Sequence, residues 1–282
     1  MKINFIKLLL LLLVGSAATS CQEKEEDLDI ELVGLGGETW VKGPVDNWLD
    51  ENYVTPYNIE VKYRFDGYEL NLGKVLTPPR EDKVIPVMET VKKTWIAPYE
   101  QEAGATFLKT LSPKQFVLVG SAEYNSNGTI TLGTAEGGRK IVLFGLNNFD
   151  TKSKFEVQRM LHIIHHEFGH ILHQNIMYPA EYKSITPSYT ASWNDYSLAD
   201  ARSRGFITEY ARNNPDDDFV EMISIMLIEG KAGIDAIVNS APEAGQLLLR
   251  QKEQMVVRYF KEAWNIDFYS LQTRTQTAIN AL

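Results

Sequence analysis

The chain has 282 residues, of which 37 are Asp or Glu and 28 are Lys or Arg, so its formal net charge at pH 7 is −9. This acidic balance excludes a general attraction for nucleic acid or anionic lipid, which both favour basic surfaces. The single cysteine excludes an internal disulfide, so the fold must be held together by its buried apolar core.

Residues 1–20 have the features of a secretory signal peptide. Lys2 and Lys7 accompany an apolar run, Leu8–Val14, that is too short to span a bilayer as a helix, and small residues follow it. The segment "ATSC" resembles the lipobox of bacterial lipoproteins, and this resemblance implies that Cys21 is lipidated and anchors the mature protein. The alternative is a secreted protein that is cut nearby, in which Cys21 has no such role.

An acidic stretch of low apolar content follows the cysteine. We expect residues 21–35 to comprise the lipidated cysteine and a solvated tether, and residues 36–282 to form one domain. In some bacterial groups such an acidic run resembles a signal for the outer cell face. The expected location is therefore the bacterial outer membrane, with the domain facing the cell surface and the periplasmic face as the alternative. The lipid is the only expected membrane contact, since no second apolar run is long enough to cross a bilayer.

The hydrophobic pattern changes from mixed to helical along the domain. Helical spacing covers residues 45–54, and a second helix is expected over 83–104, interrupted near Pro86 and ending before Gly104. Alternating or apolar runs bounded by turn residues predict strands over residues 57–65, 115–120, 129–134 and 140–145. From Phe155 onward the pattern is helical. This order predicts an α+β fold, with a small sheet in the N-terminal half, a helical C-terminal half and a soft boundary near residue 152 within one structure.

All five histidines of the chain lie between residues 162 and 173, in a segment that we expect to be helical. His166 and His170 are four residues apart, so they face the same way and can bind one ion through two imidazoles. Glu167 lies beside them, where its carboxylate could reach an ion-bound water. This HExxH arrangement is typical of zinc hydrolases. The alternative is a buried amphipathic helix whose histidines are satisfied by the core.

The neighbouring histidines leave several interpretations open. His162 and His166 have the same spacing, but Ile163 occupies the position of the acid, so that pair could hold a metal without catalysing hydrolysis. A surface position without a role in the site is the simplest interpretation of His162, and the role of His173 stays undecided. His165 points away from the stripe of His162, His166, His170 and His173 along one face of the helix. Gly169, in the middle of the helix, is explained by a close approach of another backbone or by tight packing.

A catalytic zinc usually has a third protein ligand. A histidine six residues beyond His170 is excluded, because Ile176 stands there. A later helix is predicted to start with Asn214 as its N-cap and Pro215 as its first helical residue. An acidic residue on a later helix is the other possibility, and Asp217 and Glu221 share a face of this one. The acidic candidates are Glu181, Asp195, Asp200, Glu209, Asp216, Asp217, Asp218, Glu221 and Glu229.

Together, "HHEFGH" and "YARNNPDDDFVE" resemble the motifs of gluzincin-type metallopeptidases related to the anthrax lethal factor. In that family a tyrosine precedes an acidic metal ligand by seven positions, and a Glu follows the ligand by four. The resemblance implies a zincin-like fold with one Zn²⁺ per chain, held by His166, His170 and Asp217. The family usually has Glu at the ligand position, so Asp218 and Glu221 remain alternatives. The implied roles of the other residues are general base for Glu167, oxyanion donor for Tyr210 and orientation of a ligating histidine for Glu221.

More closely still, the chain resembles lipoproteins known as substrate-import-associated zinc metallohydrolases, through these motifs, the signal and the segment "DNWLDENYVTPYNIEVKYRF". Such proteins are usually encoded beside outer-membrane nutrient importers. The resemblance implies a zinc-dependent hydrolase, foremost a metallopeptidase, that acts on a peptide or protein substrate and is associated with a TonB-dependent importer. The alternative is a catalytically silent surface lipoprotein with a structural metal that binds glycans or peptides, with the aromatic-rich residues 178–196 stacking on sugars. Intact Glu167 favours the hydrolase.

Overall fold

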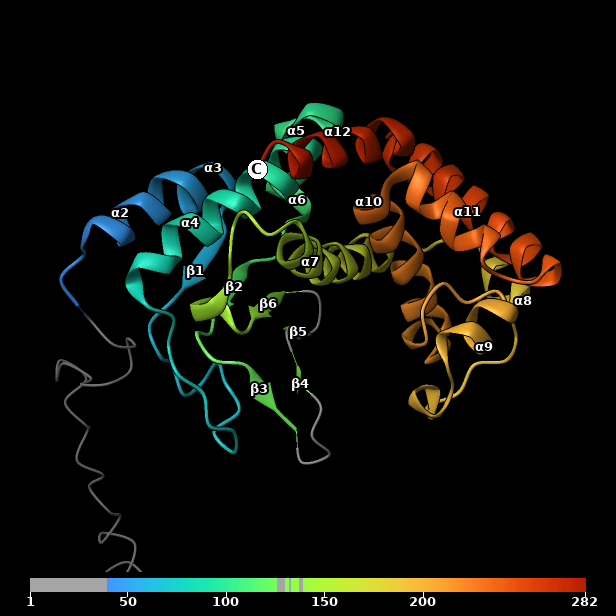
Figure 1. Ribbon diagram of the computed structural model, residues 1–282. Helices are drawn as coiled ribbons and strands as arrows, with labels where there is room; N and C mark the ends of the chain where they lie inside the picture. Colours follow the sequence, from blue (N-terminus) through green and yellow to red (C-terminus); the bar gives the residue numbers. More distant parts are fainter. Residues whose placement is uncertain (1–39, 126–129, 132, 137–138) are drawn as a thin grey trace, which may run out of the picture. The chain divides into compact units, whose positions relative to one another are not determined.

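The computed structural model describes residues 40–125, 130–131, 133–136 and 139–282 (Figure 1). The expected signal peptide, Cys21 and the whole of the expected tether lie outside the described residues. All the elements below belong to one compact unit, Lys42–Leu282. Among the described residues no helix is long and apolar enough to cross a membrane.

The first helical segment confirms the prediction for residues 45–54. It runs through α2 (Pro44–Leu49), a π-helical turn η1 (Asp50–Val54) and α3 (Thr55–Tyr57). Pro44 occupies the first turn, where a missing N–H is harmless, and the Gly43 N–H donates to Asp46 Oδ2 at 2.7 Å. The segment ends at Asn58, whose φ of 57° is left-handed.

The second helical segment comprises α4 (Glu81–Val91), the π-helical turn η2 (Lys92–Ile96) and α5 (Ala97–Ala103), followed by α6 (Ala105–Leu111). The expected interruption at Pro86 was wrong, because Pro86 lies inside α4. A proline there removes one backbone hydrogen bond. The apolar face of α4 offsets that loss, with Val84, Val87, Met88 and Val91 all buried.

The main sheet has the strand order β1-β2-β6-β5. Its strands are β1 (Glu60–Lys62), β2 (Gln115–Leu118), β5 (Gly133–Glu136) and β6 (Lys140–Leu143). β1, β2 and β6 are parallel, and β5 pairs antiparallel with β6 at the edge. β3 (Glu123–Tyr124) and β4 (Ile130–Thr131) form a separate antiparallel ladder. The strand expected over 129–134 therefore belongs to two ladders, and the strand expected over 57–65 is shorter.

Both faces of the main sheet are covered. Phe116 and Ile141 point into the main core, beneath the helices. The alternate side chains point the other way, and a smaller cluster of Val117, Val119, Val142 and Phe144 is covered by Leu70 and Leu76 from the long segment before α4. The α+β class with a small sheet in the N-terminal half is confirmed.

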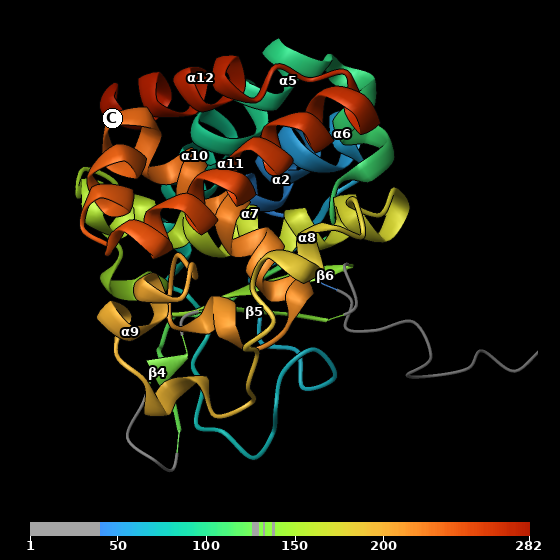
Figure 2. The same cartoon turned by 90° about the vertical axis from the view of Figure 1, so that its right-hand side faces the viewer.

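The C-terminal half consists of helices. They are η3 (Leu146–Asn148), α7 (Lys154–Asn175), α8 (Tyr182–Ile185), η4 (Trp193–Asp195), α9 (Leu198–Ser203), η5 (Tyr210–Arg212), α10 (Pro215–Asn239), α11 (Glu243–Trp264) and α12 (Phe268–Asn280). Among the helices, α7 and α10 pack together most extensively, and α11 and α12 also pack against α10 (Figure 2). In Figure 1, α7 lies above β5 and β6, so it is held between the sheet and α10. The pair α7–α10 carries the site described next.

Candidate metal centre

The helix α7 carries the histidines. It begins at Ser153, whose side chain accepts a hydrogen bond from the Glu156 N–H at 3.3 Å. Its apolar residues Leu161, Ile164, Phe168 and Leu172 are completely buried, and the histidine stripe faces α10. The spacing of four residues places the rings of His166 and His170 together, with centroids 4.9 Å apart.

The N-terminus of α10 supplies a carboxylate to this stripe. The Asn214 side chain caps the helix by accepting from the N–H groups of Asp216 and Asp217, each at 2.9 Å. The side-chain amides of Asn213 and Asn214 donate to Asp217 Oδ2 at 2.6 and 2.7 Å. These two donors fix the carboxylate, so that its other oxygen, Oδ1, faces the imidazoles. Burial alone would raise the pKa of Asp217, but the His170 ring and the Asn213 amide hold that pKa below its ordinary value.

Three donor atoms meet between the two helices. His170 Nε2 lies 3.2 Å from His166 Nε2 and 3.3 Å from Asp217 Oδ1, and His166 Nε2 lies 3.8 Å from the same oxygen. Zinc bonds of about 2.0–2.2 Å in a tetrahedron place neighbouring donors about 3.3–3.6 Å apart. The three atoms therefore fit three corners of a tetrahedral zinc site and leave the fourth corner open.

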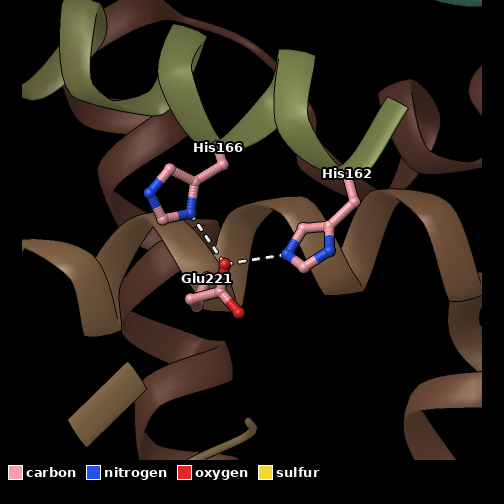
Figure 3. Close-up of side chains that lie close together, drawn as sticks. All are labelled: His162, His166 and Glu221. Atoms are coloured by element: carbon pink, nitrogen blue, oxygen red, sulfur yellow. Dashed lines mark hydrogen bonds and ion pairs between the residues drawn. The ribbon is translucent and has the colours of Figure 1, made fainter. Parts of the chain in front are cut away.

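Glu221 supports this group from one turn further along α10. Its Oε1 accepts from His166 Nδ1 at 2.7 Å and from His162 Nε2 at 2.8 Å (Figure 3). Its Oε2 accepts from the Thr208 hydroxyl at 2.6 Å. Burial alone would raise the pKa of Glu221, but the two imidazoles hold it far below its ordinary value. A carboxylate can only accept, so His166 carries its proton on Nδ1. The lone pair of its Nε2 therefore points toward the space shared with His170 and Asp217, where it can bind a metal ion.

His162, His166 and Glu221 also form a group that could in principle hold a cation. The N–O distances of 2.7 and 2.8 Å are those of hydrogen bonds, and they are shorter than the edges of a tetrahedral zinc site. We therefore describe this group as a hydrogen-bonded support of His166. This contact of His162 was not predicted from the sequence. Its spacing of four residues from His166 was a usable signal, but only the packing of α7 against α10 reveals Glu221 as the shared partner.

The remaining histidines have different surroundings. His173 Nε2 lies 2.9 Å from His170 Nδ1, and burial followed by the neighbouring His170 lowers the pKa of His173 to about 4. His165 lies off the stripe, as the helical spacing predicts. It is completely buried beside the ring of Tyr99, with centroids 5.9 Å apart, and neither of its nitrogens has a hydrogen-bond partner among the described residues. His165 is thus a core residue and belongs to no site.

Glu167 and Tyr210 border the three donors. Burial raises the pKa of the Glu167 carboxyl above its ordinary value, against the opposing effect of His166 and His170. The Tyr210 ring lies 5.7 Å from the His166 ring, and the ring of Trp193 packs edge-on against Tyr210 at 5.1 Å. Burial and the nearby Asp217 raise the pKa of Tyr210, so its hydroxyl keeps its proton near neutral pH.

Asp218, one of the alternative ligands, points to a different part of the core. Its Oδ2 forms an ion pair with Lys252 of α11 at 2.6 Å, and both side chains are completely buried. The Tyr189 hydroxyl donates to the same oxygen at 2.8 Å. Of Asp217, Asp218 and Glu221, Asp217 alone has a carboxylate oxygen facing both histidines, while Glu221 contacts the outer nitrogen of His166.

The α+β fold, with an HExxH helix and an acidic residue on the next long helix, defines a zincin-like metallopeptidase domain. A family model described as "Putative zinc-binding metallo-peptidase" matches residues 38–269, so the chain belongs to this family. A crystal structure of a "putative zinc-binding metallo-peptidase" from Bacteroides caccae is similar at 35% sequence identity and a TM-score of 0.74, over 84% of this chain and 91% of that chain. No protein with curated annotation matches the chain.

Proposed function

We propose that this protein is a zinc-dependent peptidase that holds one zinc ion through His166, His170 and Asp217. The observation that carries the proposal is the set of three donor atoms, separated by 3.2, 3.3 and 3.8 Å, whose residues interact electrostatically with the carboxyl of the HExxH glutamate, Glu167. Membership of a zinc-binding metallo-peptidase family supports it. A binding module that merely kept a metal would have no need for Glu167.

The chemistry follows from the residues around the three donors. Zinc bound there would act as a Lewis acid toward the scissile carbonyl and lower the pKa of water. Glu167 accepts the proton of the attacking water and later delivers it to the leaving amine. Its burial matches this task, because a raised pKa makes the carboxylate a better proton acceptor at neutral pH. Tyr210, which keeps its proton, donates its hydroxyl to the developing oxyanion.

A peptide substrate is favoured by the position of β5. This strand is the edge of the main sheet in the part of the chain that the structure describes, so one side of its backbone is unpaired there. Such an edge can accept an extended peptide through main-chain hydrogen bonds. β5 also runs directly against the HExxH helix, since a Cβ atom on Gly133 would lie only 2.5 Å from Ile163 Cγ2. A peptide paired with β5 would therefore lie along α7.

We also propose the location that the sequence implies. A lipid on Cys21 would anchor the protein to the bacterial outer membrane, with the domain at the cell surface. Peptide fragments released there would serve a neighbouring TonB-dependent importer. Two properties of the chain support this part of the proposal, the lipobox-like segment ending at Cys21 and the acidic residues that follow it.

The proposal is tested by zinc content and peptide cleavage of the purified protein. We expect one zinc per chain by elemental analysis, and cleavage of a mixed peptide library that is lost on chelation and restored by zinc. Glu167→Gln should keep the zinc and reduce cleavage by about 10²–10⁴-fold, since it removes the general base. Absence of stoichiometric zinc would refute the metal site. Stoichiometric zinc without any cleavage would refute the peptidase and leave a binding lipoprotein with a structural metal.

A further inference from the structure

The two histidines of the proposed zinc site differ in the hydrogen-bond partner of Nδ1, the ring nitrogen that faces away from the site. His166 Nδ1 donates to a carboxylate, that of Glu221, at 2.7 Å. No carboxylate of the described residues contacts His170 Nδ1, whose partner is another imidazole nitrogen, His173 Nε2, at 2.9 Å. His173 lies one turn beyond His170 on the same helix and is only 3% exposed.

The proton on each nitrogen follows from this contact. For His170 Nε2 to offer a lone pair to a cation, the ring proton must be on Nδ1, and His173 Nε2 must accept it. The proton of His173 is then on its own Nδ1, which is buried without a hydrogen-bond partner among the described residues. Leaving this group unpaired has a free-energy cost, so the position of His173 needs a compensating reason.

The surroundings hold the His173 ring in this orientation. It packs edge-on against the ring of Tyr178, with centroids 5.6 Å apart. Tyr178 in turn stacks on Phe219 of α10 at 4.2 Å and donates its hydroxyl to the Asp216 carboxylate, next to Asp217. The same segment of α10 therefore presents Asp217 and fixes, through Tyr178, the imidazole behind His170.

We propose that His173 is the positioning residue of His170, a neutral imidazole that takes the place of the usual carboxylate behind a zinc-ligating histidine. The proposal rests on the proposed zinc site. A neutral acceptor fixes the ring and its tautomer without adding another negative charge beside Asp217, Glu167 and Glu221. The zinc would thus remain a stronger Lewis acid than with two carboxylate-backed histidines.

The test is the zinc dissociation constant, measured on the purified protein by competition with a chromophoric chelator. His173→Leu removes the acceptor, and we expect a dissociation constant about 10–100-fold higher. His173→Gln places an amide oxygen near the position of Nε2 and should restore most of the affinity. His165→Leu is the matched control, because it removes a buried histidine of the same helix that contacts no proposed ligand, and it should bind zinc like the wild type.

The visible spectrum of the Co²⁺-substituted protein gives a second readout, which should change for His173→Leu and resemble the wild type for His173→Gln. Unfolding curves in chelator identify a variant that has lost affinity only because it is destabilised. A His173→Leu protein that binds zinc as tightly as the wild type would overturn the inference. So would His173→Leu and His173→Gln proteins that are as stable as the wild type and bind zinc equally weakly. A wild-type protein that binds no zinc would refute the proposed function itself.

Discussion

Gly169 of α7 and Val220 of α10 lie in tight contact between the two helices of the proposed metal centre. A Cβ atom built on Gly169 would lie 2.9 Å from Val220 Cγ1 and 3.0 Å from Val220 Cβ. Gly169 is therefore required by the approach of α10, although glycine within a helix is about 1 kcal/mol less favourable than alanine. The close approach brings Asp217 within reach of His166 and His170.

We predict that Gly169→Ala destabilises the protein despite the better helix propensity of alanine. Overpacking at a fixed contact typically costs about 1–3 kcal/mol, which exceeds the gain of about 1 kcal/mol. Val220→Ala removes Cγ1 but keeps the Cβ at 3.0 Å, so it should relieve part of the overlap, and the double variant should be more stable than the sum of the single changes predicts. Urea unfolding of the four proteins in chelator measures this coupling. A Gly169→Ala protein as stable as the wild type would show that the helices can separate freely.

A second prediction concerns Asp217. Asp217→Asn should weaken zinc binding by more than the 10–100-fold typical of losing an outer partner of a ligand. The amides of Asn213 and Asn214 would hold the oxygen of the introduced side chain, turning its NH₂ group toward the imidazoles. Asp216→Asn, one position earlier and half-exposed, keeps an oxygen that can accept from the Tyr178 hydroxyl, so it should bind zinc within a few-fold of the wild type. Equal affinities of Asp217→Asn and the wild type, by chelator competition, would exclude Asp217 as a ligand.

The sequence predicts those parts of the site that depend on one helix. A spacing of four residues fixes which histidines share a face, so it follows from local geometry that His166 and His170 point the same way and that His165 points elsewhere. The N-cap at Asn214 fixes where α10 begins, and hence that Asp217 and Glu221 face the same side. Fold class is equally accessible, because the strands of the described residues all lie before Phe144 and the pattern from Phe155 onward is helical.

Contacts between elements far apart in sequence could not be predicted in this way. Thr208 and His162 both bond Glu221, and this depends on the crossing of α7 and α10 and on the path of the segment before η5. Helical spacing alone left Asp217 and its neighbour Asp218 as alternatives, and the partner of Asp218, Lys252, lies on another helix. Tertiary burial also overrode local preference at Pro86, which lies within α4.

The buried pair of Asp218 and Lys252 gives a third prediction, about stability. Lys252→Met leaves an uncompensated buried carboxylate, and breaking such a pair from one side costs about 3–5 kcal/mol. Asp218→Asn combined with Lys252→Met removes both charges and should recover a large part of that loss. We expect zinc affinity in the folded double variant to be close to that of the wild type, because neither side chain faces the histidines. A loss of zinc affinity beyond 10-fold in a stably folded double variant would contradict this placement of Asp218.

The fourth prediction is a pH dependence of stability that originates in His165. Burial, with a smaller effect of His162, lowers the pKa of His165 to about 3 from its ordinary value of 6.5. Between these values the unfolded chain binds a proton that the folded protein does not. His165 therefore makes the folded state less favourable as pH falls from 6.5, by up to about 1.4 kcal/mol per pH unit, and contributes no slope above that pH.

His165→Leu removes this titration while keeping an apolar side chain against Tyr99. The free energy of unfolding of the variant minus that of the wild type should be constant between pH 7 and 8 and should increase steadily from pH 6 to pH 4. Both proteins must be measured in chelator, since zinc binding is itself pH-dependent through His166 and His170. A difference that does not vary with pH would mean that His165 becomes protonated within the fold, through water or a local opening of α7. The isolation of both its nitrogens argues against that outcome.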